Sequence, residues 1–279
     1  MEENLQYLNG KVVVVTGGGG GLGAALVTIS ARSGADVIII DIDKTQAEQL
    51  IKSLVAEGVK NAPSFYEANV ADLRNIERLL GDISKSKGSL DVMINNAAIL
   101  VAGDARDMDI DLFRKTIDIN LMGVAGGALA AYRIMAKQGY GKIVNVSSMC
   151  GILSSPLYTA YSASKHGVVG LSKALREEGR SLGIEVMVAC PGNIKTNIFD
   201  SGSVINAPKE EVFKDSALSA LTADAAAQKI ISGMIKNNGM IVFPWYAKIL
   251  YLLERIHPSL IYPLHKVVLR NFRNRRLSK

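Results

Sequence analysis

Two side chains in the segment YSASK, Tyr161 and Lys165, have types and a spacing that suit proton transfer. Four residues apart, they share one face of a predicted helix. A phenol has a pKa near ~10, too high for a base at neutral pH, and an ammonium one turn away stabilises the phenolate and lowers that pKa. The same pair is common on solvated helices, so assigning Tyr161 as the acid/base depends on its surroundings.

Ser148 and Asn120 supply that context. Ser148 lies thirteen residues before Tyr161, at the end of a predicted strand, where its hydroxyl can orient a substrate carbonyl or alcohol. Asn120 lies in a preceding predicted helix and can hold a water that relays protons to Lys165. Alone, Ser148 is equally explained as a turn cap and Asn120 as a buried amide. Ser147 competes with Ser148, and only the spacing to Tyr161 favours Ser148.

A glycine-rich loop follows four valines in VVVVTGGGGGLG, residues 12–23. Gly17, Gly21 and Gly23 match the spacing T-G-x-x-x-G-x-G, between a predicted strand and a predicted helix. Bare backbone admits a pyrophosphate, and the unpaired N–H groups at the start of a helix attract its charge. The alternative is a tight turn or flexible spacer, but the strand–loop–helix order favours a dinucleotide site. Alanine at the variable positions 18 to 20 should therefore cost less affinity than alanine at a motif glycine.

Asp41 ends the second predicted strand, 24 residues after Gly17. A carboxylate at this place accepts hydrogen bonds from an adenosine ribose and repels a 2′-phosphate. The alternative role, an acid that starts the next helix, suits Asp43 better. No arginine follows the strand, although Lys44 is near. The pattern predicts NAD in preference to NADP.

Short β-branched runs alternate with helical segments along the chain, which predicts an α/β fold with a mostly parallel, doubly wound sheet and helices on both faces. The predicted strands are residues 11–17, 36–41, 62–70, 90–98, 141–148, 184–192 and 239–244. The predicted helices are residues 22–33, 44–58, 73–86, 111–137, 158–181 and 223–237. Ligands of such sheets bind beyond the carboxyl ends of the strands, where the polar and glycine-rich segments of this chain gather.

The composition, 48% hydrophobic and 21% charged over 279 residues, is that of a folded protein with a large core, and one domain is favoured. Two cysteines, Cys150 and Cys190, suit a reducing compartment, and a cytoplasmic location is expected. No apolar run reaches the ~18 residues of a membrane span. Neither a metal site nor nucleic-acid binding is expected. The net charge of +6 divides into +7 for residues 244–279 and −1 for the rest.

Taken together, these motifs resemble the short-chain dehydrogenase/reductase family, over residues ~8 to 243. The matching residues are Thr16–Gly23, Asp41, Asn95–Ala97, Asn120, Ser148, Tyr161, Lys165, Pro191–Gly192 and Thr196. The resemblance implies a Rossmann-type catalytic domain at residues 1–243, NAD(P) binding and hydride transfer between the cofactor and an alcohol/carbonyl pair. It also implies a homodimer or homotetramer.

The resemblance also implies the remaining cofactor contacts. Asn69 and Val70 would lie beside adenine, Asn96 would support the adenine-side wall, and Ile194 and Thr196 would hold the carboxamide. The other expected contacts are Leu22, Ala97, Tyr161, Lys165, Pro191 and Gly192. Two positions depart from the family pattern. Ala98 replaces a glycine, which adds a methyl where the chain usually bends freely, and Asn69 replaces an acid.

Apolar residues between Ser148 and Tyr161 are available to line a substrate pocket: Met149, Ile152, Leu153, Leu157 and Tyr158. Together with a segment suited to a mobile lid, residues 197–208, they suggest a hydrophobic alcohol or ketone such as a steroid, retinoid or fatty compound. The alternative is that they pack in the core.

The C-terminal extension, residues 244–279, is basic and amphipathic, and Pro258 and Pro263 are expected to break it into short pieces. Two interpretations remain open: a segment lying on an anionic membrane, or a helix packed on its own body or on a partner subunit. The leading function is an oxidoreductase, and the rivals are a catalytically idle dinucleotide-binding regulator and a membrane-associated scaffold.

Overall fold

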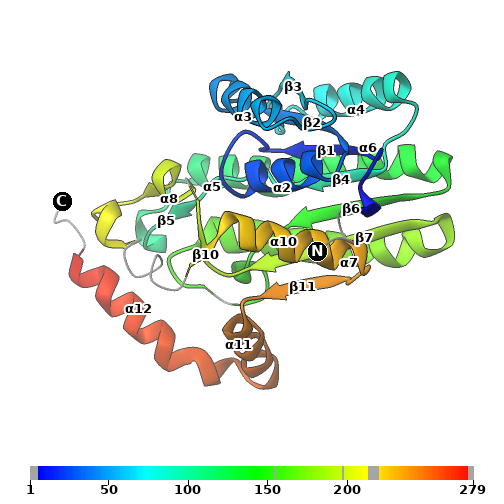
Figure 1. Cartoon of the computed structure of the whole chain (residues 1–279). Coiled ribbons are helices and arrows are strands. Elements are labelled where there is room, and N and C mark those ends of the chain that lie inside the picture. Colours follow the sequence, from blue (N-terminus) through cyan, green and yellow to red (C-terminus); the bar gives the residue numbers. More distant parts are fainter. Residues whose placement is uncertain (1–5, 154, 197, 213–219, 276–279) are drawn as a thin grey trace.

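A seven-stranded, all-parallel sheet in the order β11-β7-β6-β4-β1-β2-β3 forms the centre of the molecule (Figure 1). The computed structural model describes residues 6–153, 155–196, 198–212 and 220–275. The strands are β1 (Val12–Thr16), β2 (Asp36–Asp41), β3 (Ser64–Glu67), β4 (Val92–Asn95), β6 (Gly141–Val146), β7 (Ile184–Pro191) and β11 (Met240–Phe243). The strand order reverses between β1 and β4, which places the ligand crevice at their carboxyl ends.

Helices cover both faces of the sheet (Figure 1). They are α2 (Gly21–Arg32), α3 (Lys44–Ala56), α4 (Leu73–Lys87), α5 (Ile110–Ile117), α6 (Gly123–Gln138), α7 (Thr159–Gly179) and α10 (Ala223–Ile235). The alternation of side chains along a strand divides the core in two. Val13 and Val15 of β1 pack with α2 and α10, whereas Val12 and Val14 pack with α4 and α6. This burial on both faces explains the uninterrupted valine run.

The predicted helix at 111–137 is interrupted by a π-helical turn at Asp118–Met122, which joins α5 to α6. By length and composition the continuous helix Ile110–Gln138 could cross a membrane, since it contains an 18-residue stretch with a mean hydropathy of 1.3. The expectation that no such stretch exists is therefore wrong. However, α6 packs against α4 and the sheet, as a core helix does.

Two short parallel ladders hold the loops at the carboxyl edge of the sheet. Strand β5 (Val101–Ala102) pairs with β9 (Ser203–Val204), and β8 (Ile194–Lys195) pairs with β10 (Leu221–Thr222). The short helix α8 (Ile198–Ser201) lies between β8 and β9. The segment expected to form a lid is thus tied at both ends to the body, although residue 197 lies outside the described ranges.

The C-terminal extension forms α11 (Trp245–Ile256), a 3₁₀ turn (Pro258–Ile261) and α12 (Tyr262–Arg275). In Figure 1, α11 lies beyond β11 and α12 runs back toward the region of α8 and β5. Pro258 separates the two helices, as expected, but Pro263 does not break the chain. It lies in the first turn of α12, where a missing N–H costs no intrahelical hydrogen bond.

Candidate active site

A cavity of about 600 Å³ opens at the carboxyl edge of the sheet and collects nearly all of the predicted site residues. Those that line it are Gly17, Gly21, Leu22, Asp41, Asn69, Val70, Asn96, Ala97, Ser148, Tyr161, Lys165, Pro191, Gly192, Ile194 and Thr196. Gly23 and Asn120 do not line it. The cavity also reaches residues that the sequence did not indicate, among them Gln46 near Asp41 and Cys150 near Ser148.

The glycine loop has the backbone geometry of a close-approach site. Gly17 has φ +62° and Gly21 has φ +52°, conformations that side chains rarely adopt. A Cβ at Gly17 would lie 2.8 Å from Cα of Ala97. A Cβ at Gly23 would overlap the carbonyl oxygen of Gly17. Gly23 therefore acts by letting the start of α2 pack against the loop, although its own atoms do not line the cavity.

The N-terminus of α2 is left free for an anion. Its N-cap residue, Gly20, makes no side-chain hydrogen bond, and the first turn carries no acid. By contrast, the N-terminal N–H groups of α3 and α4 are capped by Asp43 and Asp72. The first N–H groups of a helix need a partner, so those of α2 are available to a phosphate.

Asp41 lies beside this loop, at the end of β2. Its Oδ2 accepts a hydrogen bond from the Gly19 N–H at 2.8 Å, and its Oδ1 accepts one from the Asp43 N–H at 3.1 Å. Asp43 caps α3 by accepting from the Gln46 N–H, which confirms the helix-starting role expected for it, whereas ribose binding by Asp41 stays a prediction. The Asp41 carboxylate is partly exposed to the cavity and oriented by two backbone donors.

Thr16 and Asn96 join the ends of β1 and β4 beneath the loop. The Thr16 hydroxyl accepts hydrogen bonds from the N–H groups of Asn96 and Ala97, at 3.0 and 3.2 Å. Nδ2 of Asn96 donates to the carbonyl oxygens of Thr16 and Gly17, at 3.1 and 3.0 Å. Ala98, where the family pattern has glycine, does not have a positive φ, so its methyl group strains nothing.

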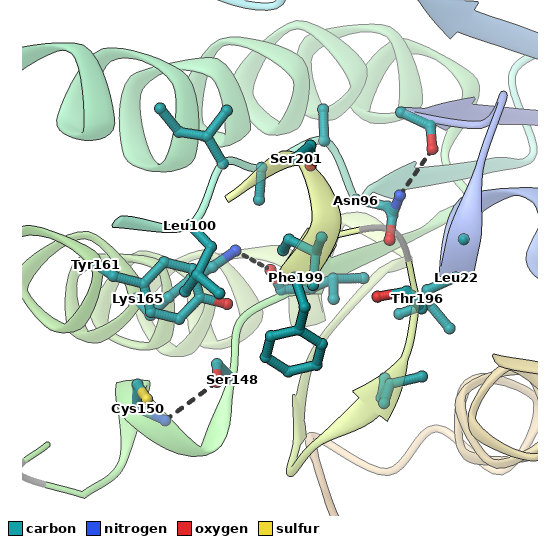
Figure 2. Close-up of a pocket in the computed structure, with 18 of the residues that line it drawn as sticks. Leu22, Asn96, Leu100, Ser148, Cys150, Tyr161, Lys165, Thr196, Phe199 and Ser201 are labelled. Atoms are coloured by element: carbon teal, nitrogen blue, oxygen red, sulfur yellow. Dashed lines mark hydrogen bonds between the residues drawn. The ribbon is translucent and has the colours of Figure 1, made fainter. Parts of the chain in front are cut away.

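Ser148, Tyr161 and Lys165 meet at the other end of the cavity, as Figure 2 shows. Nζ of Lys165 donates to the carbonyl oxygen of Val146 at 2.9 Å and lies 5.6 Å from the centre of the Tyr161 ring. The Ser148 side chain lies beside the Tyr161 phenol and accepts a hydrogen bond from the Cys150 N–H at 3.2 Å.

Ser147 and Ser148 both line the cavity, but their hydroxyl groups are engaged differently. The Ser147 hydroxyl donates to the carbonyl oxygen of Lys165 at 2.9 Å and is buried against α7. Ser148, one residue later, has its hydroxyl beside the phenol of Tyr161. The spacing that favoured Ser148 therefore corresponds to a real difference in orientation.

The electrostatics of this group differ from the sequence-based expectation. Burial raises the pKa of Tyr161 above its usual value of 10, and the neighbouring Cys150 raises it further, against the opposing effect of the nearby Ser148 hydroxyl. Burial also lowers the pKa of Lys165 to about 8. The lysine was expected to lower the pKa of the phenol, but loss of solvent around both groups outweighs their attraction here.

Asn120 is fully buried in the π-helical turn and is turned away from the cavity. Its Oδ1 accepts from the Ile99 N–H and its Nδ2 donates to the Ile99 carbonyl oxygen, both at 2.8 Å. The side chain thereby fixes the loop between β4 and β5. The amide oxygen and the amide nitrogen of Asn120 are thus both hydrogen-bonded. That Asn120 holds a relay water stays a prediction, and such a water would have to bind the main chain of Asn120 or the second lone pair of its Oδ1.

The substrate end of the cavity is apolar. Of the five residues expected there, Met149, Leu157 and Tyr158 line it, and Ile152 and Leu153 instead pack in a core cluster with α7 and β7. Beyond β8, Ile198, Phe199 and Ser201 contribute, and Figure 2 shows Phe199 facing the region of Tyr161 and Ser148.

The C-terminal extension also builds this end of the cavity, which the sequence did not predict. Val268, Asn271, Phe272 and Arg275 of α12 line it. Phe272 is buried against Leu157 and Ala207, and Nε of Arg273 donates to the buried Asp104 at 3.0 Å. The amphipathic pattern of α12 indicates an apolar face, but nothing in that pattern says where the face packs.

Among the described residues, no cluster of three or more His, Cys, Asp or Glu side chains could hold a metal ion.

Comparison with known proteins agrees with this geometry. The sequence model of the family described as short chain dehydrogenase matches residues 11–203. The 3-oxoacyl-[acyl-carrier-protein] reductase FabG of Thermotoga maritima is 37% identical over 194 residues, 68% of this chain and 76% of that protein. The dehydrogenase/reductase SDR family protein 7-like of Drosophila melanogaster is 30% identical over 258 residues, 91% of this chain and 79% of that protein.

The fold has close counterparts among solved structures. A short-chain dehydrogenase/reductase from Burkholderia phymatum, solved in complex with NAD, superposes with a TM-score of 0.82 and 24% identity, covering 91% of this chain and 95% of that one. This likeness supports the Rossmann-like arrangement of sheet and helices.

Proposed function

The chain belongs to the short-chain dehydrogenase/reductase family and is an NAD(P)-dependent oxidoreductase, and on that premise we propose that it interconverts a hydrophobic secondary alcohol and its ketone, or an alcohol and its aldehyde, with Tyr161 as the acid/base. One observation carries this proposal. A single cavity holds a glycine loop with a free helix N-terminus at one end and the group Ser148, Tyr161 and Lys165 at the other.

The residues at the loop end fit a dinucleotide. The backbone of Gly17 and Gly21 lines the cavity without side chains. No side chain caps the N–H groups at the start of α2. Asp41 lies where β2 ends and would accept hydrogen bonds from ribose hydroxyls while repelling a 2′-phosphate. We therefore propose NAD as the preferred cofactor, a choice that the family alone leaves open.

The bound nicotinamide would supply or accept the hydride. The Tyr161 hydroxyl would donate a proton to the substrate oxygen in reduction and accept it in oxidation. The Ser148 hydroxyl would hydrogen-bond the same oxygen and stabilise the charge that develops on it. Lys165, beneath the phenol, would favour the phenolate when it carries its proton.

The substrate class follows from the lining of the cavity. Leu157, Tyr158, Phe199 and Phe272 present apolar surface near the phenol, from three separate segments of the chain. A pocket of this kind selects by buried apolar area, so we propose a steroid, retinoid or fatty compound in preference to a small polar alcohol.

The oligomeric state, the location and the domain organisation are proposed on the same premise. We propose a homodimer or homotetramer, a cytoplasmic location, and a single catalytic domain at residues 1–243 that carries the extension 244–279. Contact of the extension with a membrane is a separate proposal, because it depends on the outer surface of α11 and α12. The rival functions, an idle dinucleotide-binding regulator and a scaffold, require no cluster of Ser148, Tyr161 and Lys165.

Replacing Tyr161 by phenylalanine tests the mechanism. General acid–base catalysis contributes about 10²–10⁴-fold, so Tyr161→Phe should lower kcat by about that factor in reduction of a panel of cyclic, aromatic and long-chain ketones. The Kd for NADH, measured by fluorescence titration, should stay unchanged. Tyr158→Phe is the matched control, a second buried phenol in the same cavity, and should retain activity. Full activity of Tyr161→Phe, or loss only in Tyr158→Phe, would refute the assignment.

A further inference from the structure

Large apolar side chains that stay exposed are concentrated in the C-terminal extension. Of the seventeen in the described part of the chain, nine lie between Trp245 and Val268. They are Trp245, Ile249, Leu252, Ile256, Leu260, Tyr262, Leu264, Val267 and Val268. The other eight are spread over the 240 or so residues before the extension. Scattered apolar residues are ordinary on a protein surface, but a local gathering of this kind marks an interaction site.

Helix α11 separates an anchoring side from an exposed one. Trp245, Ile249, Leu252 and Ile256 follow one another at spacings of four, three and four, which places them on one side of the helix. Their side chains are between 48% and 75% exposed. On the other side, Ala247 is buried and Leu250 and Tyr251 pack against the core cluster of β7 and α7. The helix is thus attached to the body and offers a complete apolar stripe outward.

Helix α12 adds a basic stripe to this surface. Lys266, Arg270 and Arg273 are spaced by four and three residues, and all three are exposed. Leu264, Val267 and Val268, also exposed, lie on a different part of the helix, and Val268 belongs to the rim of the cavity. Val268 therefore places exposed apolar surface of α12 at the mouth of the pocket, on the same helix as these cations.

Charge decides which occupant fits. The described part of the extension, residues 244–275, contains six Lys or Arg and one acid, Glu254. Arg273 and Arg275 form ion pairs with Asp104 and Glu211 of the body, which leaves four cations against one acid, a net charge of +3. A second copy docked through the same surface about a two-fold axis would bring two such patches face to face, and like charges would repel. A bilayer with anionic headgroups attracts the cations and accepts the apolar side chains, and tryptophan and tyrosine favour its interface.

We propose that the outer surface of α11 and α12 is a docking surface for an anionic phospholipid bilayer. The apolar stripe of α11 enters the boundary between headgroups and acyl chains, while Lys266 and Arg270 contact the headgroups. The mouth of the cavity, at Val268, then lies beside the lipid.

Co-sedimentation of the full chain with sucrose-loaded vesicles tests the proposal. Vesicles of phosphatidylcholine with one-third phosphatidylserine should bind the protein, and phosphatidylcholine alone or high salt should weaken binding strongly. The double variant Lys266→Gln/Arg270→Gln should bind anionic vesicles about 25-fold more weakly, since each charge contributes about fivefold. The variant Ile249→Ser/Leu252→Ser should bind about tenfold more weakly.

A matched control separates this surface from general surface hydrophobicity. Val55 on α3 and Ile110 on α5 are exposed to a similar degree, so Val55→Ser/Ile110→Ser should bind vesicles as the wild type does. Absence of binding to anionic vesicles would overturn the proposal, as would equal binding by both serine variants. A loss of self-association in Ile249→Ser/Leu252→Ser, seen by light scattering, with vesicle binding unchanged would instead assign the surface to a second copy.

Discussion

Alanine in place of Gly23 would force the backbone of the cofactor loop to move. A Cβ there would overlap the Gly17 carbonyl oxygen and lie 2.7 Å from both the Gly17 carbonyl carbon and Nδ2 of Asn96. Gly20 offers the matched control, because its backbone has φ −143° and ψ 167°, which any residue adopts. The nearest atom to a Cβ at Gly20 is Oε1 of Gln46, at 2.6 Å, the end of a flexible side chain.

The size of the effect follows from the contacts that must give way. An ordinary contact between a carbon and a carbonyl oxygen is about 3.3 Å or longer, so the Gly17 peptide has to shift. That shift weakens the 3.0 Å hydrogen bond from Asn96 to the Gly17 carbonyl oxygen. Overpacking costs about 1–3 kcal/mol and a lost hydrogen bond about 1 kcal/mol. The total is about 2–4 kcal/mol, divided between cofactor binding and folding.

Two measurements capture both parts. Fluorescence titration of Gly23→Ala with NADH should show a Kd raised at least about tenfold, and any cost borne by folding should lower Tm by about 2–4 °C per kcal/mol. Gly20→Ala should bind within about threefold of the wild type. If Gly23→Ala bound NADH normally and melted normally, or if Gly20→Ala were equally damaging, the loop would not be the cofactor cradle.

Three further changes probe other parts of the site. Asp41→Ala should reduce the preference for NADH over NADPH, because it removes the carboxylate that repels a 2′-phosphate; equal kcat/KM ratios for wild type and variant would contradict this. Burial lowers the pKa of Lys165 to about 8 in the cofactor-free protein, so between pH 8 and 10 the unfolded chain binds a proton that the folded chain lacks, and stability should rise with pH. Between pH 8 and 10 the free energy of unfolding of the wild type, measured with urea, should rise by about 2 kcal/mol more than that of Lys165→Met. Parallel pH profiles for the two proteins would show that Lys165 is not buried as described. Phe272→Leu should change the KM for long-chain ketones more than that for short ones and leave the Kd for NADH unaltered; a uniform KM across chain lengths would remove α12 from the pocket wall.

The parts of the fold that depend on local composition could be predicted from the sequence. The valine run of β1 is buried on both sides, and Tyr161 and Lys165 share a turn of one helix, so spacing alone brings them together. Asp43 as a helix cap and Asp41 as the cavity carboxylate were also distinguishable, because a cap needs a position just before a helix. These inferences use residues a few positions apart, except for Asp41, which was placed by its position 24 residues after Gly17.

Features set by long-range contacts could not be predicted. Asn120, within the π-helical turn, hydrogen-bonds Ile99, which is 21 residues away in the chain. The periodicity of a helical sequence does not reveal the extra residue of a π-helical turn. The raised pKa of Tyr161 depends on how much solvent the surrounding chain removes, which spacing does not report. The return of α12 to the cavity joins Arg273 to Asp104 across 169 residues.

The attachment of α12 decides how closely the extension and the cavity are connected. Asp104 is buried, but Arg106 already contacts both of its carboxylate oxygens, at 3.0 and 2.8 Å. The ion pair between Arg106 and Asp104 therefore already compensates the buried carboxylate, and the hydrogen bond from Arg273 is an additional contact. What remains is burial of Phe272, worth about 1.5–3 kcal/mol, and the contacts of Arg275 with Glu211 at the surface. These contributions are modest, so the position of α12 is held by a few kcal/mol. A ligand that binds the outer surface of α12 therefore acts on a weakly held helix. The same helix supplies Val268, Asn271 and Phe272 to the cavity. A surface contact and the choice of substrate are thus physically linked through one helix.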